Sequence, residues 1–484
     1  MKKIIIFILI AIIVIAIPVN AQKPHGIDST PLNPGELITP VNIEPVSIDE
    51  ALKKRISNIG KPAKNVIFII ADGMNSAAIT LARAVLVGRQ NLLEIDRFPV
   101  TGRVIGYAED AQVNDSASAG SAFATGKEQG LKRISVDSRG NPQQTIFELA
   151  KNRGLKVGLV SDTMMTNATP AAFSAHVENR DEGEKIAEQM IKNGFDLLLS
   201  GGRDYFIPKE AGGKQAKGKN LLEEAAKTGY QIAGTGDELK RIAASGSGKL
   251  LGLFAPGYLP FSFEDPLHAI PSISELAAAA ISFLSKEDKG FLLMIELGDI
   301  DPALHGHDCS ELVYQMKELE KVIKIANDFL KTRSDTLLVL VSDHGTGGMS
   351  ITENFNADIF RKCATSTIFL ARQLGDKPIT AESVKTKLTS TFPSLTFTQG
   401  EIDSLCSAAT PSELEMRLGS IVYGKLGLYF LDSDLIPSMP TTRGHTGEDL
   451  FIHAKGCHQG IFGGVLRNWE VGRRIASALG FSFP

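Results

Sequence analysis

The sequence predicts an α/β fold, a three-layer α/β/α sandwich around a mostly parallel central sheet. Short, continuously apolar runs recur along the chain, as expected for strands that are buried on both faces of a parallel sheet. Helical patterns separate these runs, which is the order of elements typical of an α/β sandwich. The chain has 484 residues, 43% of them hydrophobic, so it can form one large domain with an insertion, or two or three domains.

The first 21 residues are a predicted signal peptide. Lys2 and Lys3 give a positive start, residues 4–17 are wholly apolar, and small residues precede a cleavage site after Ala21. An uncleaved anchor is the alternative, but the apolar run is shorter than the roughly 20 residues that a membrane span needs. We therefore expect an exported protein, periplasmic or extracellular, without a stable membrane anchor after cleavage.

Proline-rich residues 22–62 are predicted to form an extended N-terminal leader with a short helix near 48–56. The α/β domain is predicted over 63–350 and 441–484. Its predicted strands are 66–70, 157–160, 195–199, 291–295 and 336–341, and its predicted helices are 143–152, 273–284, 311–330 and 471–479. The alternation stops over 351–440, which we interpret as an inserted subdomain beside the site, with an amphipathic stretch at 381–388 and a strand-like stretch at 421–430.

Charge and cysteine content limit the possible partners and cross-links. The net charge is −4, and without a basic surplus we expect neither nucleic acid nor anionic membrane surfaces as partners. Four cysteines, Cys309, Cys363, Cys406 and Cys457, would allow two disulfides in an oxidising compartment, and three pairings are open. We prefer Cys363 with Cys406 because both lie in the inserted segment.

Acidic and imidazole side chains follow three of the predicted strands. Asp72 directly follows the first strand, at the edge where open α/β sheets bind ligands, although Asp-Gly turns are also common without a ligand. Glu296 ends a later strand, and Asp301 and His305 lie four residues apart, so a helix would place both on one face. Histidine with carboxylate suits zinc, whereas Glu296 suits a harder ion such as magnesium.

The adjacent Asp343 and His344 end another buried strand and are followed by glycines, which favours a ligand pair over a capping Asp beside a core His. His445 stands in a glycine-flanked loop and is a weak signal by itself. His307 is a competing ligand candidate, and we expect Asp299 and Asp308 to be solvated or capping. Together the clusters would supply ligands for two transition-metal ions and one hard cation.

Ser116 follows Asp115 and opens a run of small residues that predicts a helix. Unpaired N–H groups at a helix N-terminus favour an alkoxide or a phosphate oxygen. A serine there is equally compatible with a simple N-cap. Beside a metal cluster it becomes a candidate nucleophile, because metal coordination lowers the pKa of a hydroxyl.

This set of motifs resembles the alkaline phosphatase family over roughly 62–350 and 440–484. The resemblance rests on motifs in the family's order: Asp72-Gly73-Met74, Asp115-Ser116-Ala117, Ala168-Thr169-Pro170-Ala171, Arg180, the segment from Glu296 to His305, Asp343-His344 and His445-Thr446-Gly447. It implies an alkaline phosphatase-like sandwich with a crown-like inserted subdomain. It also implies hydrolysis of small-molecule phosphate monoesters and a homodimer.

The resemblance further implies site roles, residue by residue. Two zinc ions would be held by Asp301, His305 and His445, and by Asp72, Asp343 and His344; one magnesium ion would be held by Asp72, Thr169 and Glu296. Ser116 would form a phosphoseryl intermediate, and Arg180 would bind two non-bridging oxygens of the phosphoryl group. The ligand types also admit cobalt or manganese in place of zinc.

Two positions depart from better-known relatives. Asn167 stands where those relatives carry Asp or His, and Pro302 stands where they carry Lys or His. Proline has no group that could bind phosphate, so we expect weaker phosphate affinity. Asn167 bears on the hydration and the identity of the third metal ion, which we therefore leave open.

Three other functions fit parts of the pattern. A sulfatase of this superfamily would need Arg four residues after its nucleophile, where this chain has Gly120. A phosphodiesterase of the same superfamily commonly uses Thr, so Ser116 favours monoesters. A non-catalytic exported metal- or phosphate-binding protein would have closed sites with four protein ligands, whereas each zinc site here has three.

Overall fold

The computed structural model describes residues 61–483, except 217, 262, 266–267, 287, 364, 376–378 and 432–443. The predicted signal peptide, the helix near 48–56 and nearly all of the predicted leader lie outside the described residues. Among the residues described, no helix has both the length and the apolar character needed to cross a bilayer.

The main sheet has ten strands among the described residues, in the order β14-β2-β13-β8-β1-β7-β3-β4-β6-β5. The strands are β1 Asn65–Ala71, β2 Val100–Ile105, β3 Lys156–Met164, β4 Leu197–Gly201, β5 Tyr230–Ala233, β6 Lys249–Leu253, β7 Phe291–Leu297, β8 Thr336–Val341, β13 Leu450–Gly456 and β14 Gly464–Arg467. The seven strands from β8 to β5 run parallel, and β13 is antiparallel to both of its neighbours. The predicted mostly parallel sheet is confirmed.

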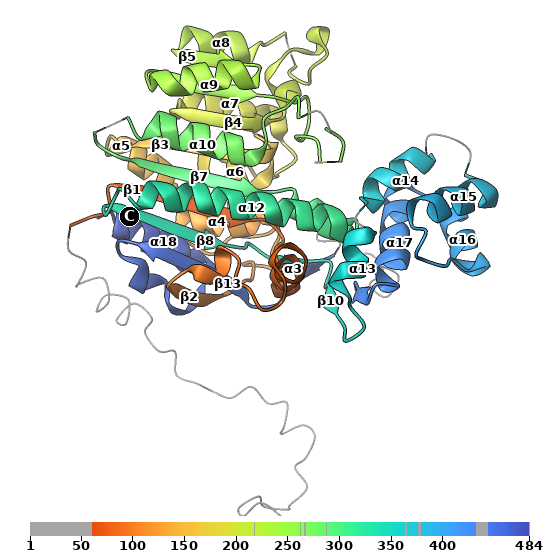
Figure 1. Cartoon of the computed structure of the whole chain (residues 1–484). Helices are drawn as coiled ribbons and strands as arrows, with labels where there is room; N and C mark the ends of the chain where they lie inside the picture. The colour runs from red at the N-terminus through yellow and green to blue at the C-terminus, as the bar shows by residue number, and fades with distance from the viewer. Residues whose placement is uncertain are drawn as a thin grey trace, which may run out of the picture. The chain divides into compact units, whose positions relative to one another are not determined.

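Successive residues of β1 enter two different cores because side chains alternate across a strand. Ile67 and Ile69 join the core that contains residues of α9, α10 and α12. Val66 and Phe68 join the opposite core, which contains residues of α4, α5, α6, α7 and α18. Helices therefore cover both faces of the sheet, and the predicted three-layer sandwich is confirmed; Figure 1 shows α10 and α12 crossing the face turned to the viewer.

The helices of the two covering layers include most of those predicted. Their bounds are α3 Ser76–Ala82, α4 Ser116–Thr125, α5 Ile146–Asn152, α6 Ala168–Ser174, α7 Gly183–Asn193, α8 Leu221–Lys227, α9 Gly236–Ser245, α10 Ile273–Leu284, α11 Ile300–His305, α12 Cys309–Leu330 and α18 Asn468–Ala478. The helix expected from the Asp301 and His305 spacing is α11, and the small-residue helix that begins at Ser116 is α4.

The segment 351–440 holds helices, and one sequence prediction there is wrong. The helices are α13 Ala357–Lys362, α14 Thr367–Gly375, α15 Ala381–Thr391, α16 Gln399–Cys406 and α17 Pro411–Gly424. The strand predicted at 421–430 is the end of α17 followed by the two-residue strand β11 (Leu428–Tyr429). Leu414, Leu418 and Val422 recur every four residues, and their burial on one helical face outweighs the local β-propensity.

The four cysteines are free thiols, so the preferred pairing of Cys363 with Cys406 is wrong in this structure. Cys309 is buried, and its Sγ lies 3.8 Å from Sδ of Met349. Its surroundings are those of a core side chain and not of a metal ligand.

Four neighbouring parallel strands, β8, β1, β7 and β3, end at one edge of the sheet. Polar clusters follow or end these strands, so the topology gathers them there. A short antiparallel ribbon, β9 (Gly345–Thr346) with β12 (His445–Thr446), adds a segment from far along the chain to the same edge. A second ribbon pairs β10 (Ser350–Ile351) with β11.

Candidate metal and phosphate site

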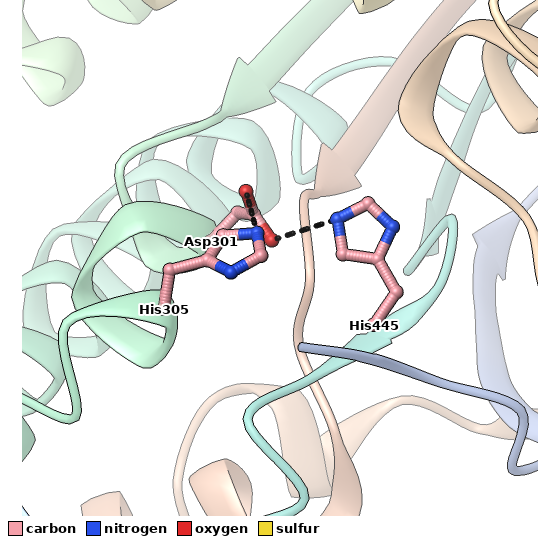
Figure 2. Close-up of side chains that lie close together, drawn as sticks. All are labelled: Asp301, His305 and His445. Atoms are coloured by element: carbon pink, nitrogen blue, oxygen red, sulfur yellow. Dashed lines mark ion pairs between the residues drawn. The ribbon is translucent and has the colours of Figure 1, made fainter. Parts of the chain in front are cut away.

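Asp301, His305 and His445 converge at this edge. The Nε2 of His305 lies 3.2 Å from Oδ2 of Asp301, and the Nε2 of His445 lies 3.8 Å from Oδ1 of Asp301. Figure 2 shows the Asp301 carboxylate between the two imidazoles. Their ligand atoms lie within 4.8 Å of one another, a spacing suited to one metal ion. The His305 side chain remains 33% exposed, so solvent or a substrate can reach this cluster.

Asp72, Asp343 and His344 form a second cluster that is deeply buried, with relative exposures of 4%, 0% and 2%. The Nε2 of His344 lies 3.5 Å from Oδ1 of Asp72 and 3.4 Å from Oδ2 of Asp343. These two carboxylate oxygens have no hydrogen-bond partner in the described structure. Two buried carboxylate oxygens aimed at one imidazole nitrogen are stable together only if a cation or protons compensate their charge.

Hydrogen bonds fix which nitrogen of each imidazole faces the clusters. The hydroxyl of Thr346 lies 2.6 Å from Oδ1 of Asp301 and donates its only proton to that carboxylate. The Thr346 hydroxyl oxygen also lies 3.2 Å from Nδ1 of His344. Because the only proton of this hydroxyl goes to Asp301, its oxygen accepts here, so Nδ1 of His344 carries the proton and Nε2 keeps its lone pair. Nδ1 of His445 lies 3.0 Å from the carbonyl oxygen of Asn114, which likewise leaves Nε2 free to bind a metal.

Burial keeps two of the imidazoles neutral. It lowers the pKa of His344 to about 4 and the pKa of His445 to about 3, the latter with help from the neighbouring histidine charges. His305 behaves differently: burial lowers its pKa, but the charge and the hydrogen bond of Asp301 together outweigh burial and raise the pKa. Neutral imidazole is the form that binds metal ions.

Glu296, Asp72 and Thr169 form a third, all-oxygen group beside the second cluster. Oε2 of Glu296 accepts hydrogen bonds from Ser161 at 2.5 Å and Thr163 at 3.3 Å, whereas Oε1 has no hydrogen-bond partner among the described residues. The Thr169 hydroxyl lies 3.5 Å from Oδ2 of Asp72. Burial raises the pKa of Glu296 to about 7 and that of Asp72 well above its usual range. An all-oxygen set with an unpartnered carboxylate oxygen fits a hard cation.

Ser116 is the first residue of α4, and Asp115 caps that helix by accepting from the Ser118 N–H at 2.9 Å. Because Asp115 supplies the cap, the Ser116 hydroxyl is not needed as one. Its Oγ lies 3.2 Å from Nε2 of His344, at the second cluster. The residue is 4% exposed, so its oxygen is shielded from bulk water but adjacent to candidate metal ligands.

Arg180 is held by two neighbours and keeps donors free. Nη1 donates to Oδ2 of Asp115 at 3.2 Å, and Nη2 donates to Oδ1 of Asn167 at 3.1 Å. Each terminal nitrogen carries two N–H groups, so one on each remains for a ligand. The side chain is 24% exposed, which allows access. Although burial opposes it, the carboxylates of Asp115 and Asp72 raise the pKa of Arg180, and the guanidinium stays charged.

The structure departs from the expectations for the minor members of these motifs. Asp308 caps α12 as expected, but Asp299 is 2% exposed and makes no capping hydrogen bond, so it is neither solvated nor capping. His307 lies apart from the clusters, with its Nδ1 2.7 Å from Oγ of Ser420 and its ring stacked on Phe430. It is therefore not a competing ligand in this arrangement.

Some residues of the site were not predicted from the sequence. For Thr346 a signal exists, because it follows His344 by two residues and so lies on the same side of the chain. Asn114 acts through its backbone carbonyl, which any residue could supply. Tyr258 comes from the segment between β6 and α10, and its hydroxyl lies 3.1 Å from Nδ2 of Asn167.

Known proteins are similar to this chain in sequence and in fold. The family model described as alkaline phosphatase matches residues 63–481. The chain is 31% identical over 437 residues to alkaline phosphatase 3 of Bacillus subtilis, covering 87% of this chain and 89% of that protein. It is 30% identical over 358 residues to the alkaline phosphatase of Escherichia coli, covering 64% and 76% respectively.

Solved structures show the same likeness. The alkaline phosphatase of Thermus thermophilus superimposes with a TM-score of 0.77 at 25% identity, covering 91% of this chain and 97% of that one. The cold-active alkaline phosphatase of a psychrophilic Shewanella superimposes with a TM-score of 0.73 at 28% identity, covering 86% and 99%.

Proposed function

This chain belongs to the alkaline phosphatase family and is a phosphomonoesterase, and we propose that it acts through a phosphoseryl intermediate on Ser116. One observation carries this proposal: the Ser116 hydroxyl lies 3.2 Å from a histidine of a buried cluster that has the ligand set of a metal site. Phosphate monoesters of small molecules are its substrates by family.

The donor sets support two zinc ions and one magnesium ion as cofactors. Asp301, His305 and His445 would hold the first zinc ion, and Asp72, Asp343 and His344 the second. Magnesium would be held by Asp72, Thr169 and Glu296, an assignment that the unpartnered Glu296 Oε1 supports. When bound, these cations supply Lewis acidity that lowers the pKa of a hydroxyl or water and stabilises a leaving oxygen.

The chain's own residues then carry out two displacements at phosphorus. In the first, the Ser116 hydroxyl loses its proton and Oγ forms a bond to phosphorus as the bond to the leaving oxygen breaks, and the leaving alcohol takes up a proton. In the second, water loses a proton and forms the new bond to phosphorus, the bond to Ser116 Oγ breaks, Oγ takes up a proton, and inorganic phosphate is released. The N-terminus of α4 favours negative charge at Ser116 in both steps.

Arg180 would bind the phosphoryl group through the one N–H that remains on each terminal nitrogen. Two parallel donors match two non-bridging oxygens and favour a dianionic monoester. A diester places a substituent on one of these oxygens, which weakens the match. Pro302 supplies no charge near Asp301, so phosphate would be held mainly by Arg180 and the cations.

Location and assembly also belong to this proposal. The predicted signal peptide over residues 1–21 would direct export to the periplasm or the cell exterior. The inserted subdomain over 351–440 would border the site, since Phe430 stacks on His307, two residues after His305. A homodimer is proposed from family membership alone.

The direct test compares p-nitrophenyl phosphate with bis-p-nitrophenyl phosphate, using mature protein supplied with zinc and magnesium, before and after a chelator. Fast, chelator-sensitive hydrolysis of the monoester with little diester turnover is expected. Preference for the diester would contradict the role given to Arg180 and favour a phosphodiesterase.

Ser116→Ala separates catalysis from metal binding. We expect turnover to fall by a factor of about 10³ or more, because the phosphoseryl route is lost, while the metal content stays unchanged. Wild-type protein that binds its metals but hydrolyses neither ester would instead favour a metal- or phosphate-binding protein.

A further inference from the structure

Tyr258 is an exposed aromatic side chain that none of the proposed catalytic steps uses. It belongs to the segment between β6 and α10, and 46% of the residue is exposed to solvent. The next residue, Leu259, is 5% exposed, so the chain buries the leucine and leaves the larger ring in contact with water. Single exposed apolar side chains are common and need no explanation by themselves. The surroundings of Tyr258 therefore decide whether its ring has a role.

Hydrogen bonds tie the backbone on both sides of Tyr258 to the ends of two neighbouring parallel strands. The carbonyl oxygen of Gly257 accepts the N–H of Gly202, just after β4, at 2.6 Å. The N–H of Leu259 donates to the carbonyl oxygen of Asp162, near the end of β3, at 2.8 Å. The segment is therefore held at the same edge of the sheet as the candidate site.

The hydroxyl end of Tyr258 is anchored beside the phosphate-binding arginine. Oδ1 of Asn167 accepts the N–H of Ala168 at 2.7 Å and Nη2 of Arg180 at 3.1 Å, which fixes the orientation of the amide. Its Nδ2 then donates to the Tyr258 hydroxyl at 3.1 Å. One amide group thus links the tyrosine to the guanidinium, and Arg180 is the charged residue that acts most strongly on the tyrosine hydroxyl.

These restraints hold the Tyr258 ring between its backbone at the sheet edge and the amide of Asn167. A side chain fixed at both ends loses little conformational entropy when a ligand packs against it. The body of a tyrosine is apolar, whereas the two residues that hold Arg180 are polar. The ring therefore offers a rigid apolar surface beside the donors that would bind the phosphoryl group.

A phosphate monoester also has an alcohol part, for which the proposed mechanism names no contact. Arg180 would bind non-bridging oxygens, and the cations would bind the oxygens in the line of displacement. The alcohol part must then extend toward the open side of the site, where Arg180 and His305 are partly exposed. The exposed ring of Tyr258 is available there through its link to Arg180.

We propose that Tyr258 is a specificity-determining residue whose ring packs against the alcohol part of the substrate. Esters of aromatic alcohols are then preferred to esters of small polar alcohols. The packing of two aromatic rings corresponds to a preference of about three- to tenfold. This inference rests on the proposed function, because it takes Arg180 as the group that binds the phosphoryl oxygens.

The test compares benzyl phosphate with glycerol 1-phosphate, using mature protein supplied with zinc and magnesium. Both are esters of primary alcohols, so their leaving oxygens are similar and the ratio of their kcat/KM values reports the contact with the alcohol part. We expect Tyr258→Ala to lower kcat/KM for benzyl phosphate about three- to tenfold, through a higher KM. For glycerol 1-phosphate the change should be less than about twofold, because only the exposed hydrogen bond to Asn167 is lost.

Tyr258→Phe separates the ring from the hydroxyl. It keeps the apolar surface and loses the bond to Asn167, so the preference for benzyl phosphate should stay within about twofold of the wild type. If Tyr258 served only to hold Asn167, both substitutions would instead change both esters by the same factor. Tyr314→Ala removes another partly exposed tyrosine ring, on α12, and should behave like the wild type.

Phosphonates give a readout that does not depend on turnover, because they have no ester bond to the alcohol part. Benzylphosphonate and methylphosphonate are titrated into the same proteins by calorimetry. The wild type should bind benzylphosphonate more tightly, and Tyr258→Ala should reduce that preference about three- to tenfold. If neither ester is hydrolysed, the proposed function fails, and these titrations still decide the role of the ring.

The proposal is overturned if Tyr258→Ala changes kcat/KM for the two esters by the same factor, or leaves both unchanged. It is also overturned if the wild type binds the two phosphonates with equal affinity, or binds neither.

Discussion

Asn167→Ser tests whether the neighbours of Arg180 prepare it for phosphate. Oδ1 of Asn167 accepts the Ala168 N–H at 2.7 Å, at the start of α6, and also Nη2 of Arg180 at 3.1 Å. Serine can still cap a helix, but its shorter side chain cannot reach the guanidinium. The substitution therefore removes one of the two anchors of Arg180 and leaves the bond from Nη1 to Asp115.

The expected loss of phosphate affinity follows from the conformational entropy that the Arg180 side chain regains in the unbound variant. Ordering a long side chain on binding costs about 0.5–1.5 kcal/mol. One anchor remains in the variant, so we take about 1 kcal/mol, which corresponds to about fivefold weaker phosphate binding. The side chain is 24% exposed, and solvent competition keeps the value from being larger.

The assay is the inhibition constant of inorganic phosphate during hydrolysis of p-nitrophenyl phosphate, supported by calorimetric titration with phosphate. Tyr258→Phe is the matched control, because it removes the hydroxyl beside Asn167 Nδ2 and keeps the bond to Arg180. We expect a change of less than about twofold for this control, since the lost hydrogen bond is partly exposed to water. Unchanged phosphate affinity in Asn167→Ser, with an unchanged unfolding temperature, would refute the reasoning.

Three further outcomes follow from the structure. Burial lowers the pKa of His176, but the hydrogen bonds to Glu148 and to the Ser135 carbonyl, together with the charge of Glu148, outweigh burial and raise the pKa. The charged imidazole therefore stabilises the fold below its unfolded pKa near 6.5, and this contribution is lost as pH rises through the folded pKa. The stability difference between wild type and His176→Gln, from chemical denaturation, should therefore be larger at pH 6 than at pH 9 by about 1 kcal/mol; equal differences would contradict this. Phe68→Ala should cost about 3–5 kcal/mol of unfolding free energy, because the ring is 1% exposed within the aromatic core. A loss of unfolding free energy as small as that from replacing an exposed side chain would contradict the packing. Tyr423→Phe should cost about 1–3 kcal/mol, because it leaves the buried Asp308 without the hydroxyl that donates to it at 2.9 Å; unchanged thermal unfolding would contradict that role.

Much of the fold can be predicted from the sequence, because the parallel strands are buried on both faces. Such strands, β1 and β8 among them, form continuous apolar runs that need no knowledge of their neighbours. The strands that were missed lack this signal. Strand β2 is half-exposed, with glycine and arginine in its middle, and β13 is identified mainly by its pairing with β2 and β8.

The candidate ligands could be proposed for a similar reason. Asp72 and the pair Asp343-His344 stand directly after buried strands, where the chain leaves the sheet. The four-residue spacing of Asp301 and His305 also places both side chains on one face of α11. For these residues the sequence needs no long-range information, since strand direction and helical spacing are local properties.

The tertiary structure alone decides how the clusters are completed. His445 reaches Asp301 because β12 pairs with β9, placing His445 opposite Thr346. The hydroxyl of Thr346 then sets both the Asp301 carboxylate and the His344 tautomer. Likewise, the Tyr258 hydroxyl meets Asn167 only because the segment after β6 is hydrogen-bonded to the ends of β3 and β4.

The sequence by itself therefore determined the sandwich, the strand ends and the kinds of ligand that stand there, since each depends on patterns within a few neighbouring residues. The packing of distant segments decided which ligands meet, which imidazole nitrogen is free and which carboxylates lack a partner. These properties depend on distances between residues far apart in the chain, and local periodicity does not encode such distances.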